Sequence, residues 1–210
     1  MNINKFILNF PQDTVRYNFI DKQFITQKIK DYKIITGING YNLNRHDYNL
    51  NTNRKIYRSL KLGEIGCLLG HKKIYKYALD NKLSTIVVLE DDVTICKDFQ
   101  KELDNKYLNI PTDFDIVLLG SSNIWLNKYK KDCILEDTNN DYYKLIQGHH
   151  YGNHIYLITE KAMIKILECN TTTYPIDILV SQLNLNVYIS KTQLAHQTRG
   201  FKSHTRKKLI

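Results

Sequence analysis

The chain has 210 residues, of which 42% are hydrophobic and 24% are charged. This composition suits one globular domain with a substantial core and excludes disordered, collagen-like and low-complexity proteins. No apolar run approaches the roughly 18 residues of a membrane-spanning helix, and the first residues show no secretory signal. We therefore expect no transmembrane segment and a cytoplasmic location, with peripheral attachment to a membrane, or a host cytoplasm for a viral protein, as variants.

The formal net charge is +9, from 30 lysines and arginines against 21 aspartates and glutamates, and much of the excess lies near the C-terminus. No acidic residue follows Asp177, whereas six basic residues do: Lys191, Arg199, Lys202, Arg206, Lys207 and Lys208. We divide the chain into a domain over residues 1–190 and a basic tail over 191–210. Both a solvated tail and a phosphate-binding segment fit this pattern.

Strands and helices are predicted to alternate from the start of the chain. A buried strand over 4–10 is followed by an amphipathic helix over 13–31 and by a strand with a Gly-rich turn over 31–40. A long Asn-rich loop over 41–58 precedes a helix over 62–81, whose apolar residues form one stripe. These elements begin an α/β pattern.

The middle of the chain continues the same alternation. A β-branched strand within 82–95 breaks into three carboxylates, and helical character resumes over 97–108. A buried strand over 113–122 is followed by a charged segment over 127–141, which we expect to be a loop.

The last third supplies a predicted strand pair and further helices. The pair, 143–147 and 154–160, flanks a Gly-containing turn, and helices are expected over 160–169 and 178–186 before a final strand over 187–190. The whole pattern predicts an α/β domain with a largely parallel sheet, whose binding site lies at the carboxyl ends of the strands.

Three adjacent carboxylates, Glu90, Asp91 and Asp92, stand directly after the predicted buried strand TIVVL. Adjacent carboxylates repel one another, so a cation or basic neighbours must compensate them. Hard oxygen ligands suit manganese or magnesium, which often bridge protein carboxylates to substrate phosphates. The alternative is that one aspartate caps the helix near Asp98 or lies in a solvated turn.

Glu64 and His71 are two turns apart on the predicted helix and so share one face. That face would contact substrate, or His71 would be a packing residue and Glu64 would stabilise the helix start. Arg16 suits a phosphate or a structural carboxylate equally well.

The cysteines and clustered histidines show no metal-binding spacing. The four cysteines lie far apart without a CxxC motif: Cys67, Cys96, Cys133 and Cys169. This pattern indicates free thiols and disfavours a disulfide framework or a zinc site. His149, His150 and His154 are also irregularly spaced, which favours a hydrogen-bonded loop.

Several segments resemble, in the same order, glycosyltransferase family 25, the lipopolysaccharide and procollagen galactosyltransferase type. The strongest are LGEIGCLLGH at 62–71 and VVLEDDV at 87–93, and the others are ILNF with Arg16, ITGINGYNL at 35–43, FDIVLLG at 114–120, GNHIYLITEKAMIKIL at 152–167, YPIDILV at 174–180 and HQTRGFKS at 196–203. Gly70 stands where the family usually has serine, and His204 departs from the family pattern in the tail.

The resemblance implies a GT-A-like, Rossmann-type nucleotide-sugar-binding domain that transfers a hexose, galactose or glucose, from a UDP-sugar with inversion. The acceptor would be a glycan or a hydroxylated protein, and the cofactor manganese or magnesium. Asp92, with Glu90, would hold the metal, and Glu90 and Asp91 would lie near the ribose or the metal.

The remaining roles follow from the chemistry of inverting transfer, which needs a base and groups that bind the diphosphate. Asp177 is the predicted base, unless it only caps a helix, and Glu64 is the second catalytic candidate. His71, Arg16, Gln197 and Arg199 complete the predicted donor and substrate contacts; the tail would fold over the diphosphate as a lid.

Three other functions remain open. A nucleic-acid-binding protein fits the basic tail, although no binding motif is present and nucleic acid is the less favoured partner. A metal-dependent phosphoesterase or nuclease would use the same carboxylates. A catalytically degenerate protein that only binds a nucleotide sugar fits the departures at Gly70 and His204.

Overall fold

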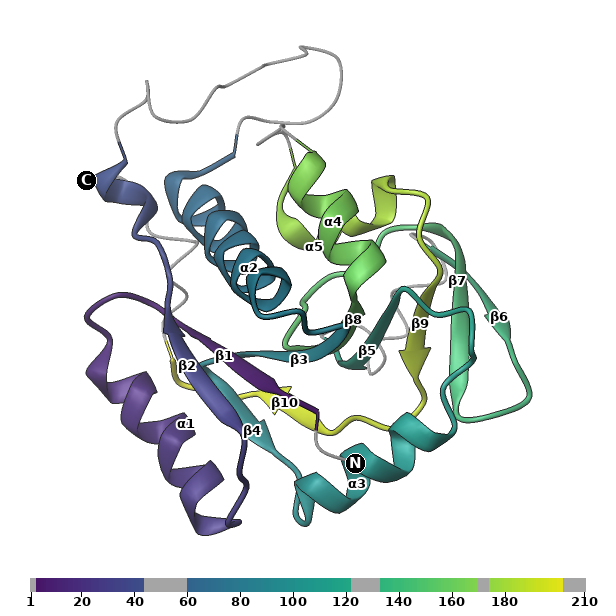
Figure 1. Cartoon of the computed structure of the whole chain (residues 1–210), viewed down its shortest axis with the longest axis horizontal. Coiled ribbons are helices and arrows are strands. Elements are labelled where there is room, and N and C mark those ends of the chain that lie inside the picture. The colour runs from purple at the N-terminus through teal and green to yellow at the C-terminus, as the bar shows by residue number, and fades with distance from the viewer. Residues whose placement is uncertain (1–2, 44–59, 122–132, 170–173, 202–210) are drawn as a thin grey trace.

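The computed structural model, drawn in Figure 1, describes residues 3–43, 60–121, 133–169 and 174–201. Ten strands occur in these residues: β1 (Lys5–Asn9), β2 (Tyr32–Thr36), β3 (Thr85–Glu90), β4 (Val93–Ile95), β5 (Ile116–Gly120), β6 (Cys133–Asp137), β7 (Tyr142–Gly148), β8 (Ile155–Thr159), β9 (Val187–Ser190) and β10 (Ala195–Gln197). The helices are α1 (Thr14–Thr26), η1 (Gly40–Asn42, one 3-10 turn), α2 (Leu62–Asp80), α3 (Phe99–Leu108), α4 (Glu160–Glu168) and α5 (Ile176–Gln182).

Eight of the strands form one mixed sheet in the order β2-β1-β3-β8-β5-β9-β7-β6. The parallel pairings are β1 with β2, β1 with β3 and β5 with β9. The other four pairings are antiparallel. The expected α/β class is confirmed. The sheet, which the sequence predicts to be largely parallel, is mixed: β1, β2 and β3 form a parallel group, and β8, β7 and β6 enter antiparallel to their neighbours.

Helices cover both faces of this sheet (Figure 1). Buried residues of α2, α4 and α5 pack on one face, and those of α1 and α3 pack on the other together with the small β4–β10 sheet. Alternation along β3 serves both layers, because Ile86 and Val88 belong to the first cluster and Val87 and Leu89 to the second. A strand buried on both faces explains why TIVVL is continuously apolar.

Every strand and helix predicted within the described residues forms, but three local expectations were wrong or incomplete. Cys133–Asp137 is strand β6 and not a loop; it lies at the sheet edge and is largely exposed, so it lacks an apolar pattern. The two strands predicted to pair with each other, β7 and β8, are not neighbours in the sheet, because β8 lies between β3 and β5. The expected loop at 41–58 lies mostly outside the described residues.

The segment predicted as a basic tail contributes to the fold before residue 202. Ala195–Gln197 forms β10, which pairs antiparallel with β4. Residues 202–210 lie outside the described part, so the lid role of the tail stays a prediction. Among the described helices, none is both long and apolar enough to cross a membrane.

The start of α2 packs against the η1 turn at backbone distance. A Cβ on Gly66 would lie 2.4 Å from the Ile38 carbonyl oxygen and 2.6 Å from the Gly40 amide nitrogen. Neither atom belongs to a flexible side chain, so the backbones themselves would have to separate. This contact holds the GEIGC segment beside the ends of β1 and β2.

We predict that Gly66→Ala lowers the free energy of unfolding by about 1–3 kcal/mol, because the added methyl group overpacks this contact. The loss should occur although alanine is the better helix former by about 1 kcal/mol. Urea unfolding followed by circular dichroism measures it. Lys76→Ala, an exposed change on the same helix, is the control and should stay within about 0.5 kcal/mol; equal stability of the two variants would contradict the prediction.

Candidate active site

A pocket of about 150 Å³ lies where the three parallel strands β1, β2 and β3 end, beside the first turns of α2. The register places Leu8 opposite Glu90 and Asn9 opposite Thr36, so these strands end at the same edge. Five of the predicted site residues line the pocket: Arg16, Glu90, Asp91, Asp92 and Gln197. The sheet edge therefore brings together the acidic cluster, a buried arginine and part of the predicted tail.

Asp91 is the most completely paired of the three carboxylates. Its Oδ2 accepts hydrogen bonds from the Asn9 side chain at 2.8 Å and the Phe10 amide at 3.0 Å, and its Oδ1 accepts from Arg16 Nη1 at 2.9 Å. Burial raises the pKa of Asp91, although the Phe10 N–H and the Arg16 charge oppose that rise. These contacts give Asp91 a structural role. They also show that Arg16, for which a phosphate or a carboxylate partner was expected, pairs with a carboxylate.

Asp92 keeps one carboxylate oxygen free of such partners. Its Oδ2 lies 3.3 Å from Arg16 Nη1 and accepts from Gln197 Nε2 at 3.1 Å. Its Oδ1 is buried and has no hydrogen-bond partner among the described residues. A buried carboxylate oxygen without a partner is costly, and in a pocket it is suited to bind a cation.

Glu90 pairs with a histidine that the sequence analysis did not assign to the site. Because β8 runs antiparallel to β3, the residue before β8, His154, lies beside the end of β3. Its Nδ1 is 3.2 Å from Glu90 Oε2, and the Glu90 amide donates to the His154 carbonyl at 3.0 Å. Burial raises the pKa of Glu90. Burial disfavours charge on His154, but its hydrogen bond to Glu90 and the charge of Glu90 raise its pKa.

Cys67 lies at the wall of the pocket, and His71 lies behind that wall. Cys67 lines it, whereas His71 is fully buried and its Nδ1 lies 2.7 Å from the Tyr156 hydroxyl. Burial lowers the pKa of His71 to about 4. The Cys67 thiol has a raised pKa, mainly from burial and then from the charges of Glu90 and Asp177. Cys67 therefore reaches the pocket surface, whereas His71 is buried behind it.

The two predicted catalytic carboxylates occupy helix starts. Asp177 lies in the first turn of α5; its Oδ2 accepts from the Gly152 amide at 3.3 Å and its Oδ1 from the Ile178 amide at 3.0 Å. Glu64, the third residue of α2, accepts from the Lys61 amide at 2.8 Å and so caps the start of that helix. Neither lines the pocket, and their catalytic roles stay predictions.

The remaining candidates are placed as follows. Gln197 lies in β10 and reaches Asp92, whereas Arg199 is exposed and lies outside the pocket lining. His150 is hydrogen-bonded to Asn153 at 2.7 Å, as expected for a loop histidine. None of the four cysteines forms a disulfide within the part of the chain that the structure describes.

A solved structure shares the fold of this chain. The crystal structure of a glycosyltransferase involved in the glycosylation of the major capsid of PBCV-1 matches with a TM-score of 0.51 at 8% identity, covering 95% of this chain and 94% of that one. At this identity the likeness concerns the fold alone. The protein has the mixed-sheet α/β architecture of GT-A-like glycosyltransferases, which confirms the predicted fold class.

The chain belongs to glycosyltransferase family 25 (LPS biosynthesis protein), whose model matches residues 2–180. It is 31% identical over 108 residues to the lacto-N-neotetraose biosynthesis glycosyltransferase LgtE of Neisseria meningitidis serogroup B, covering 50% of this chain and 38% of that protein. It is 32% identical over 77 residues to human procollagen galactosyltransferase 2, covering 35% of this chain and 12% of that protein. The family match over residues 2–180 confirms the predicted family. Each of these two relatives is covered over less than two thirds of its own length.

Burial of the neutral His71 ring makes stability depend on pH. The unfolded state takes up a proton near the ordinary pKa of 6.5, whereas the folded state does so only near 4. The stabilising contribution is thus complete above about pH 6.5 and is lost as pH falls toward 4. At pH 4.5 we expect a loss of about 2–3 kcal/mol from this group.

The test compares wild type with His71→Gln by urea unfolding between pH 7 and 4.5, with chelator present. The variant should lose about 2–3 kcal/mol less than wild type over this range. His196→Gln, at an exposed position, is the matched control and should follow wild type. Parallel pH profiles for wild type and His71→Gln would contradict the assignment.

Proposed function

We propose that the protein transfers a hexose, galactose or glucose, from a UDP-sugar to a hydroxyl group of a glycan or hydroxylated protein, with inversion and with a divalent cation. The observation that carries the proposal is the unpaired, buried Oδ1 of Asp92 in the pocket of a family 25 member. An α/β fold of this kind binds its ligand at the carboxyl ends of its strands, which is where this pocket lies.

The residues present fit manganese or magnesium. Asp92 offers one oxygen that the described protein leaves unpaired, and Glu90 offers a carboxylate whose side chain is 24% exposed. Such ions are commonly held by one or two carboxylates together with substrate phosphates and water. When bound, the ion would neutralise charge on the departing diphosphate.

The chain's own residues would prepare the site for the donor. Arg16 lies within ion-pair distance of both Asp91 and Asp92, so its positive charge offsets part of the repulsion between the two carboxylates. Gln197 donates to Oδ2 of Asp92, and Oδ1 stays without a hydrogen-bond partner among the described residues. The positions of these groups are set before the donor arrives, which lowers the cost of ordering them during the reaction.

Asp177 is our candidate for the base that removes the proton from the acceptor hydroxyl. Two backbone amides orient its carboxylate, and its charge is felt by Cys67 at the pocket wall. A general base must be held in a fixed orientation and must reach the hydroxyl proton. The two amide hydrogen bonds to Asp177 meet the first of these requirements. Glu64, which caps α2, would support the site by holding that helix.

The alternative functions have less support. Arg16, the arginine that lines the pocket, is paired with Asp91 and Asp92. Among the described residues, the pocket therefore offers a nucleic acid no arginine that is not already paired with a carboxylate. Gly70, where the family usually has serine, packs against Leu8, and a Cβ there would meet the end of that flexible side chain at 2.9 Å. Gly70 does not itself line the pocket, but Leu8 does, so the departure changes the packing beside the site, and the assays below decide between an active and a degenerate protein.

The first prediction of this proposal concerns Asp92. UDP release from UDP-galactose or UDP-glucose should require manganese or magnesium, stop with chelator, and fall about 100-fold or more in Asp92→Asn. The control is Asp80→Asn, an identical chemical change at the exposed end of α2, which should leave the rate unchanged. Metal-independent release, or full activity of Asp92→Asn, would overturn the proposal.

Three further measurements distinguish the alternative functions from sugar transfer. Donor binding by calorimetry without turnover on any acceptor would indicate a binding protein. Hydrolysis of a phosphodiester without a sugar donor would indicate a phosphoesterase. Strongly salt-dependent DNA binding that UDP does not displace would indicate a nucleic-acid-binding protein.

A second prediction concerns Asp177. Asp177→Asn keeps an oxygen that can accept the Gly152 amide hydrogen bond but removes the basic carboxylate. We expect kcat to fall about 10²–10⁴-fold while the KM for the donor changes less than about twofold. Initial-rate kinetics with varied donor measure both, and Asp80→Asn again serves as control. A raised donor KM with unchanged kcat would show that Asp177 binds the donor and is not the base.

A further inference from the structure

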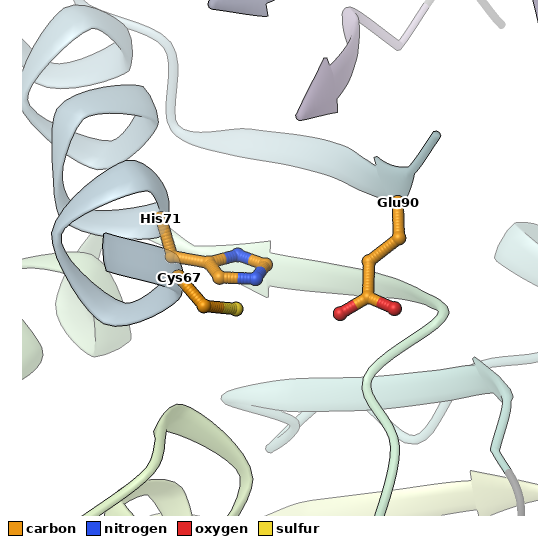
Figure 2. Close-up of side chains that lie close together, drawn as sticks. All are labelled: Cys67, His71 and Glu90. Atoms are coloured by element: carbon orange, nitrogen blue, oxygen red, sulfur yellow. The ribbon is translucent and has the colours of Figure 1, made fainter. Parts of the chain in front are cut away.

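Three metal-ligating side chains of different chemistry converge beside the pocket (Figure 2). Cys67 and His71 lie one turn apart on α2 and project toward Glu90 at the end of β3. One ligand atom from each, the Cys67 sulfur, a His71 ring nitrogen and a Glu90 carboxylate oxygen, lie within 4.8 Å of one another. The tertiary structure thus assembles a set of ligands that the sequence spacing did not indicate.

An unpaired nitrogen in this cluster points to a missing ligand. His71 is fully buried, and its Nε2 has no hydrogen-bond partner among the described residues. A buried polar atom without a partner costs about 1–3 kcal/mol. Its other nitrogen, Nδ1, is already engaged by Tyr156, so Nε2 is the atom that remains for a ligand.

A chain of hydrogen bonds allows the tautomer that a metal needs. Nδ1–H can donate to the Tyr156 hydroxyl oxygen at 2.7 Å, and that hydroxyl can donate to Tyr75 at 2.5 Å. The proton then sits on Nδ1 and the lone pair on Nε2. Hydrogen bonding of the second ring nitrogen is the usual way in which proteins orient a metal-binding histidine, and His154 orients Glu90 in the same manner.

We propose that Cys67, His71 and Glu90 bind Zn²⁺ through Sγ, Nε2 and a carboxylate oxygen. Thiolate, imidazole and carboxylate are zinc ligands, whereas manganese and magnesium prefer oxygen alone. Tetrahedral zinc would bring the ligand atoms to about 3.5 Å from one another, so the present cluster must contract by about 1 Å. Cys67 gives up its thiol proton to solvent as the metal binds.

The fourth coordination position would open to the pocket. Cys67 and Glu90 both line the pocket, while His71 closes the site from the core. Three protein ligands with one open position is the arrangement of a zinc site that accepts water or a substrate oxygen. Zinc at this position would also draw Glu90 away from the cation proposed at Asp92. The proposal rests on these contacts alone and holds whether or not the protein transfers sugar.

The experiment uses the full chain, freed of metal by dialysis against chelator and then titrated with Co²⁺ and with Zn²⁺. We expect one equivalent of Co²⁺ to produce thiolate-to-cobalt charge-transfer absorption, which Zn²⁺ then removes. Zn²⁺ should also raise Tm, because it binds the folded state. The absence of charge-transfer absorption, or of Zn²⁺ binding with one-to-one stoichiometry by calorimetry, would overturn the proposal.

Matched variants locate the site. Cys67→Ser should abolish the charge-transfer band and weaken Zn²⁺ binding by about tenfold or more. Cys96→Ser, which changes another half-buried free thiol on the opposite side of the sheet, should leave both unchanged. Zn²⁺ binding by Cys67→Ser equal to wild type, or equal losses in both variants, would refute the assignment.

Two further variants keep the test independent of folding and of the proposed activity. If Cys67→Ser does not fold, Glu90→Gln replaces it and should weaken Zn²⁺ binding to the same extent. Asp92→Asn should bind Zn²⁺ like wild type, because Asp92 belongs to the oxygen-lined part of the pocket. Loss of Zn²⁺ binding in Asp92→Asn, with retention in Glu90→Gln, would show that zinc merely occupies the manganese site.

Discussion

The compensation of three consecutive carboxylates at the end of β3 is the constraint on which the site depends. Asp91 and Asp92 are almost completely buried, and leaving one buried charge unpaired costs several kcal/mol. Arg16 from α1 contacts both, and the Phe10 amide, just after β1, adds a hydrogen bond to Asp91. Gln197 comes from β10, and His154 directly precedes β8. The one acidic run therefore contacts elements from both ends of the chain.

The same compensation divides the carboxylates by function. Both carboxylate oxygens of Asp91 accept hydrogen bonds from protein groups, so this residue has a structural role. Asp92 keeps one oxygen unpaired, and Glu90 is partly exposed beside His154. Adjacent residues of the same type thus differ in chemistry because each meets a different neighbour, and only the incompletely paired ones suit a cation.

Two kinds of metal chemistry meet across Glu90. On the side of Asp92 the available ligand is oxygen, whereas on the side of α2 the ligands are the sulfur of Cys67 and the nitrogen of His71. If both proposed sites bind metal, the two sides of Glu90 would distinguish hard from borderline cations by ligand type. Glu90, whose carboxylate faces both sides, would connect the two.

The sequence alone determined the α/β class, nearly all the strands and helices, the family and the acidic cluster, because apolar periodicity and ordered motifs are local signals. It did not reveal β6, the position of β8 between β3 and β5, or β10 inside the expected tail. Strand order depends on long-range pairing, which no local pattern encodes. For this reason the pairing of Glu90 with His154, the use of Arg16 by Asp91 and Asp92, and the convergence of Cys67 and His71 on Glu90 were decided only by the tertiary structure.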